Sequence, residues 1–250
     1  MQSKLTKMLH LQRQPVGIYF ANTEARCDLD ADPKKRNCVI PLLMKAAEGM
    51  TVSMDEESCN CAGGATGCCF GDGFARLNPS IAKLLSQGYG ENAPAEMPAF
   101  MKEGERFFCT EAVAEKFREG LPYSRRAYPR IVFAPMSRWE EIGQPDLVYV
   151  FVNPDQLGAL VSMLCSHNGE VNNTISPYCS ACQSILFAAE QMEKTRPCAV
   201  MGLFDISQRY APLGNLLSLT IPYCRWAELT QDLDKSCLTT HSWRTIEKRL

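Results

Sequence analysis

The strongest constraint on the fold is a short segment, residues 147–152, in which every side chain is apolar or aromatic. A run of this length is typical of a strand, and a strand without polar positions is buried on both faces. Asn153-Pro154 follows directly and begins a helical pattern, since an Asn N-cap followed by Pro favours a helix start. We therefore expect a central strand followed at once by a helix.

The rest of the chain alternates between strand-like and helix-like segments, which predicts an α/β or α+β fold with a mixed sheet flanked by helices. Residues 90–104 show no strong period and are expected to form a loop. We predict a single domain over residues 1–250, with a sub-division near 90–105 as the alternative. Further strands are expected at 16–20, 51–54, 130–134, 198–203 and 216–221, and helices at 41–49, 78–88, 110–120, 154–164, 185–192, 225–233 and 243–250.

Composition narrows the class of protein. The 250 residues are 46% hydrophobic, enough to build a core without covalent cross-links. With 26 basic and 28 acidic residues, the chain has no electrostatic drive toward nucleic acid or an anionic membrane. No apolar run is long enough to span a bilayer, and residues 1–13 lack the apolar segment of a signal peptide. These features predict a cytoplasmic location.

Cysteine is unusually frequent, with 13 residues in the chain. An odd number cannot pair completely, and disulfides are rare in a reducing compartment. Metal binding or redox chemistry is therefore the leading explanation. Most of the isolated cysteines, such as Cys109, Cys165 and Cys198, are expected to act as small apolar side chains.

Two clusters of cysteines are candidates for a site. The first lies in a Cys/Gly-rich segment near residues 58–73, expected to be a loop whose glycines let the backbone wrap an anionic group. The second is a C-x-x-C pair just before a predicted helix. Adjacent cysteines project in different directions, so one centre would need ligands from both clusters, which must then meet in space. The predicted cofactor-binding residues are Cys59, Cys61, Cys68, Cys69, Cys179 and Cys182, with all but Cys59 as metal ligands.

We rank an iron–sulfur cluster of the 4Fe-4S type first, because four thiolates are its usual ligands. Such a protein would be an anaerobic redox or cluster-dependent enzyme, or an electron carrier for one. Zinc is the alternative, as a structural ion in a binding or regulatory module, although only one clean C-x-x-C pair is present. Dithiol redox chemistry, a thiol-based metal or sulfur carrier, and coincidental thiols in a loop are further options.

Candidates for catalytic side chains are few. Arg209 could orient a small anionic substrate, because guanidinium groups bind carboxylates and phosphates in pairs of hydrogen bonds. Asp72 lies beside glycines and could act as an acid or base. The predicted partners are a redox partner protein or such an anionic substrate, with homo-oligomerisation as a further option.

An ordered set of short motifs resembles a known family. It comprises Pro15-Val16-Gly17, Cys38 before a helix, Cys61-Ala62-Gly63-Gly64, Asn153-Pro154, and the pair Cys179 and Cys182. This order is similar to that of the domain-of-unknown-function 169 family of prokaryotic proteins. The resemblance implies an iron–sulfur interpretation of the cysteines and anaerobic hosts. The chain departs from the family pattern at residues 202–209, where it has Phe204 and Asp205 in place of a cysteine.

Overall fold

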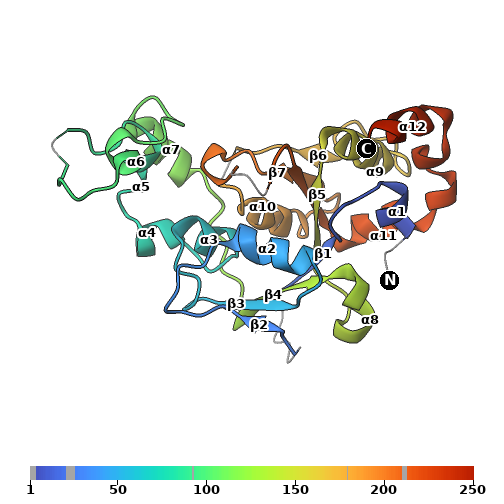
Figure 1. Cartoon of the computed structure of the whole chain (residues 1–250), viewed down its shortest axis with the longest axis horizontal. Coiled ribbons are helices and arrows are strands. Elements are labelled where there is room, and N and C mark those ends of the chain that lie inside the picture. The colour runs from blue at the N-terminus through green and yellow to red at the C-terminus, as the bar shows by residue number, and fades with distance from the viewer. Residues whose placement is uncertain (1–3, 21–25, 92, 179, 210–212) are drawn as a thin grey trace.

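A mixed sheet of eight strands forms the centre of the computed structural model (Figure 1). The model describes all of the chain except residues 1–3, 21–25, 92, 179 and 210–212. In spatial order the strands run β2-β3-β4-β1-β5-β8-β7-β6. Their bounds are β1 (Val16–Phe20), β2 (Leu29–Asp30), β3 (Val52–Asp55), β4 (Arg130–Pro135), β5 (Leu147–Val152), β6 (Thr174–Ile175), β7 (Ala199–Gly202) and β8 (Leu217–Pro222).

The central pairs are antiparallel and the pairs at both edges are parallel. β5 pairs antiparallel with β1 and with β8, whereas β2 runs parallel to β3 and β6 parallel to β7. The expected mixed sheet flanked by helices is therefore confirmed. Residues 147–152 form a strand with the predicted bounds, and it has neighbours on both sides.

Burial on both faces explains the sequence of β5. Leu147, Tyr149 and Phe151 pack in one core, and the alternate residues Val148 and Val150 pack in a second core on the other face. Burying one such side chain contributes about 1.5–3 kcal/mol. A polar residue at any of these positions would lose that contribution, which is why the segment has no polar alternation.

The helices form layers on the two faces. The first core contains residues of α2 (Val39–Ala47), α3 (Ala62–Gly67) and α10 (Ser184–Gln191). The second contains residues of α1 (Lys4–Met8), α9 (Pro154–Cys165), α11 (Tyr223–Gln231) and α12 (His241–Ile246). In Figure 1 these two groups lie to the left and to the right of β5. No helix in the described part of the chain is long and apolar enough to cross a membrane.

A third group of helices lies outside these layers, at the left of Figure 1. It consists of α4 (Gly73–Leu77), α5 (Ile81–Leu85), α6 (Ala99–Glu103) and α7 (Glu111–Glu119), while α8 (Trp139–Ile142) stands apart, after β4. The group has a small core of its own around Phe74, Ile81 and Leu121. We call residues 73–121 the outer helical unit. Its side chains line a cavity together with residues at the starts of α2 and α3 and just before α10.

Two predicted loops contain helices. The Cys/Gly-rich segment near 58–73 folds in part as α3 and leads into α4, so the expectation of a loop there is wrong. Residues 90–104 contain the short helix α6. The glycines of α3 favoured a loop in the prediction, because glycine is unfavourable in a helix interior by about 1 kcal/mol relative to alanine. The helix forms nevertheless, and its glycines allow close contact with a segment that is distant in sequence.

Candidate functional site

A cavity of about 580 Å³ lies between the outer helical unit and the starts of α2, α3 and α10. This volume is within the range of small-molecule and cofactor sites. One side of the cavity carries three cysteines from segments far apart in the sequence, Cys38, Cys61 and Cys182. We call these three residues the thiol wall.

The local structure explains why these thiols meet. Cys38 is the N-cap of α2 and Cys61 is the N-cap of α3, both with extended backbone. Neither side chain caps its own helix, so both are left to line the cavity. Cys182 precedes α10 by two residues and is 7% exposed. Each thiol thus lies directly or almost directly before the first residue of a helix.

Polar neighbours hold two of the thiols in place. The Cys38 Sγ donates to Oε1 of Gln208, at 3.4 Å. Burial raises the pKa of the Cys38 thiol, and nearby Cys61 adds to the rise while the charge of Arg36 opposes it. The Cys182 Sγ lies 3.2 Å from the carbonyl oxygen of Gly63 and donates to it.

Glycines bring α3 against the segment before α10. A Cβ added at Gly67 would lie 2.8 Å from the carbonyl oxygen of Cys182, and one at Gly63 would lie 3.1 Å from Ser180 Oγ. Only glycine permits this approach without moving backbone at Gly67. The expected meeting of residues 59–69 with the C-x-x-C pair is therefore seen for Cys182, whereas Cys179 lies outside the described residues.

The other three cysteines of the first cluster point elsewhere. Cys59, Cys68 and Cys69 have no exposed surface and belong to the core beneath α3. Burial raises the pKa of Cys68 well above the usual range, and it raises the pKa of Cys69 to about 12. We call these three residues the core thiols. None of them lines the cavity, so their positions do not support the ligand roles predicted for them.

The two adjacent cysteines diverge, as expected. Cys69 has a φ of 60°, in the left-handed region, whereas Cys68 has a φ of −83°. Cys68 interacts with Cys59 and Cys182, and Cys69 with Arg126. The different surroundings of these two thiols do not favour their binding one metal centre.

The two candidate catalytic residues have structural roles. Asp72 is the N-cap of α4, where its Oδ1 accepts from Ala75 N at 2.8 Å and its Oδ2 lies 3.7 Å from an Arg118 Nη1. Arg209 donates to the carbonyl oxygens of Leu203 and Leu216, each at 2.8 Å. Neither side chain lines the cavity, and the guanidinium is directed at backbone rather than at a ligand site.

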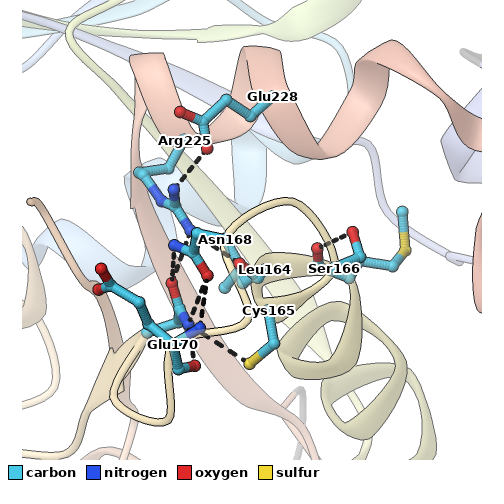
Figure 2. Close-up of polar contacts among 9 residues, drawn as sticks. Leu164, Cys165, Ser166, Asn168, Glu170, Arg225 and Glu228 are labelled. Atoms are coloured by element: carbon cyan, nitrogen blue, oxygen red, sulfur yellow. Dashed lines mark hydrogen bonds and ion pairs between the residues drawn. The ribbon is translucent and has the colours of Figure 1, made fainter.

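A separate network, shown in Figure 2, accounts for one of the isolated cysteines. The buried Arg225 donates from Nη2 to the carbonyl of Leu164 and to Oδ1 of Asn173, both at 2.7 Å, and also pairs with Glu228. Asn173 Nδ2 in turn lies 3.5 Å from Cys165 Sγ. The network ties the end of α9 to α11, none of its residues lines the cavity, and it gives Cys165 a structural setting.

The part of the cavity lining that contains no thiols was not predicted from the sequence. It is formed by aromatic residues of the outer helical unit and by two carboxylates, Glu105 and Asp205. We call this part the aromatic–acidic wall. The available signal was the density of phenylalanine at Phe100, Phe107 and Phe108, in and beside a segment interpreted as a loop. Cys38 was also left out of the predicted ligands, although its position directly before a helix matches that of Cys61.

The donor set suits a bulky group better than a single ion. Among the described residues, no three His, Cys, Asp or Glu side chains are placed closely enough to hold a metal ion. The thiol wall instead spreads three thiols along a cavity. Iron–sulfur clusters are held by cysteine thiolates, and thiols are the donors that this cavity offers.

The fold and the cavity together define a mixed-sheet α/β protein with a thiol-lined cavity at the helix starts. Residues 4–232 match the model of the domain-of-unknown-function 169 family, described as uncharacterised ArCR, and the chain belongs to this family. The resemblance of its ordered motifs is thereby confirmed. No curated protein and no solved structure matches the chain.

Proposed function

We propose that the protein binds an iron–sulfur cluster at the thiol wall and that the adjoining cavity accepts a small-molecule substrate. The observation that carries the proposal is the convergence of Cys38, Cys61 and Cys182 on one cavity of about 580 Å³. Three segments separated by more than twenty residues each contribute a thiol there. Cys38 and Cys182 also contact the first core, but unlike the core thiols they border the cavity.

The proposed ligands differ from those expected from the sequence. Cys61 and Cys182 are retained, Cys38 replaces Cys68 and Cys69, and the sequence offers Cys179 as a fourth thiol three residues before Cys182. A cluster of the 4Fe-4S type would supply single-electron transfer or an open iron site that acts as a Lewis acid. The protein's own residues would hold and orient it: Gln208 accepts a hydrogen bond from Cys38, and the Gly63 carbonyl accepts one from Cys182.

The size of the cavity favours an enzyme over a simple electron carrier. A carrier needs a cluster near the surface, whereas this thiol wall lines a space of ligand size together with the aromatic–acidic wall. In this proposal a redox partner protein would supply or remove electrons, in the cytoplasm of an anaerobe. Homo-oligomerisation is an option that the proposal does not require.

Metal and sulfide analysis of protein purified and reconstituted without oxygen tests this proposal. We expect a brown protein with about four iron and four acid-labile sulfide per chain, the composition of a 4Fe-4S cluster. The matched control is Cys224→Ser, which alters an exposed cysteine outside the cavity and should leave both contents unchanged. One zinc per chain without visible absorption would favour the zinc-stabilised module instead. A colourless protein with neither metal would refute cluster binding, and the carrier hypothesis would then predict reactive thiols at residues 59–69.

A further inference from the structure

We propose that the aromatic–acidic wall of the cavity binds an organic cation, such as an alkylated ammonium group with an apolar surface. Two carboxylates and a group of aromatic rings face the same space. Carboxylates attract the charge, and ring faces bind the alkyl surface and the cation together. The inference does not depend on the cluster, because none of these side chains is a proposed ligand of it, even though the charge of Asp205 also raises the pKa of the Cys38 thiol.

The carboxylates lack a cationic partner in the protein. In the part of the chain that the structure describes, neither Glu105 nor Asp205 forms an ion pair. Asp205 is only 7% exposed, and its Oδ1 accepts from Ser207 N and Oγ at 3.0 and 2.6 Å. Burial raises the pKa of Glu105, and the charge of Asp205 raises it further, so the two carboxylates act on each other. A bound cation would offset both the burial of the Glu105 carboxylate and its repulsion by Asp205.

The aromatic rings lie beside the carboxylates. Phe108 and Phe117 have their centroids 4.8 Å apart, and Tyr178 packs edge-on against Phe108 at 6.0 Å. Tyr178 remains 41% exposed. The backbone N–H of Glu105 donates to Leu84 O at 2.7 Å, which ties the Glu105 backbone to α5, and the side chain lines the same cavity as the rings.

One basic residue of the described chain lines the cavity, and both it and Asp205 lie close enough to Cys38 for their charges to act on the thiol. The charge of Arg36 acts on Cys38, and Arg36 forms no ion pair with either carboxylate in the described structure. With Arg36 included, the charged residues of the cavity still sum to a negative charge. This negative charge would repel the small anionic substrate expected from Arg209, whose guanidinium is directed at backbone carbonyls.

Binding measurements on metal-free, reduced protein test the inference with three probes of one shape and different charge. Choline is the cation, dimethylbutanol is its neutral carbon isostere, and dimethylbutyrate is the anion. By calorimetry we expect choline to bind about tenfold or more tightly than the neutral isostere, because a charge-assisted contact is involved, and the anion not to bind. Equal binding of choline and dimethylbutanol, or tighter binding of the anion, would overturn the inference.

Variants distinguish the contribution of the carboxylates to binding from that of the aromatic rings. Glu105→Gln should weaken choline binding about tenfold while leaving dimethylbutanol unchanged. Tyr178→Leu, which keeps an apolar side chain but removes the ring, should weaken choline binding severalfold, whereas Tyr178→Phe should not. Choline binding unaffected by both Glu105→Gln and Tyr178→Leu would place the cation elsewhere and refute the assignment. Because the protein is metal-free, failure here leaves cluster binding untouched.

Discussion

The thiol wall and the core thiols use the same residue type for different purposes. Cys59, Cys61, Cys68 and Cys69 all come from one segment of eleven residues, yet only Cys61 reaches the cavity. The difference arises from α3: its N-cap faces the cavity, whereas the residues before and after it turn into the core. The spacing of cysteines in the sequence therefore identifies candidate ligands only once the path of the backbone is known.

The largest expected difference between the two groups is in reactivity toward alkylation. At pH 8 a thiol with a pKa of about 12 is ionised in about one molecule in ten thousand, roughly a thousandfold less than an ordinary thiol. Cys69 should therefore be labelled by iodoacetamide about a thousandfold more slowly than a free cysteine peptide. Its rate should rise about tenfold per pH unit up to pH 11, since the thiolate fraction does so while the protein stays folded.

Peptide mass spectrometry of native, metal-free protein measures this, with Cys61 as the internal comparison. Cys61 is partly exposed and should be labelled within the time in which Cys69 stays unmodified. Equal labelling of Cys61 and Cys69 at pH 8 would remove the distinction between thiol wall and core thiols.

A methyl group at Gly67 should disturb the contact that creates the thiol wall. The new Cβ would lie 2.8 Å from the carbonyl oxygen of Cys182, so Gly67→Ala should lower the free energy of unfolding by about 1–3 kcal/mol. Gly158→Ala is the matched control, because Gly158 lies in α9 with open space around its Cα. That control should stabilise the protein by about 0.5–1 kcal/mol. Urea unfolding of both variants measures the difference, and a Gly67→Ala protein as stable as the wild type would contradict the close packing.

Serine substitutions should distinguish the core thiols from the thiol wall by a smaller difference in the free energy of unfolding. Cys68→Ser places a hydroxyl in the core, where Cys59 is a weak partner, and should cost about 1–2 kcal/mol of the free energy of unfolding. Cys61→Ser should change the same quantity by less than about 0.5 kcal/mol in metal-free protein, because its side chain borders the cavity. Similar losses for both variants would mean that Cys61 also serves the core.

Much of the sheet could be predicted from the sequence, because the strands carry a local signal. β5 is apolar at all positions since both of its faces are buried, and the Asn153-Pro154 start of α9 is a local capping signal. α3 could not be predicted, because its glycines are explained by a contact with residue 182, which is remote in sequence. The ligand set changed for the same reason: Cys38 is isolated in the chain and joins Cys61 only in the folded structure.

Iron and sulfide contents of two sets of variants test the central claim most directly. After anaerobic reconstitution, Cys38→Ser, Cys61→Ser and Cys182→Ser should each lose most of the iron, the acid-labile sulfide and the visible absorption. Cys59→Ala and Cys69→Ala, which remove core thiols, should retain all three if the variant is folded by circular dichroism. Loss of the cluster in the core variants with retention in the thiol-wall variants would contradict the account.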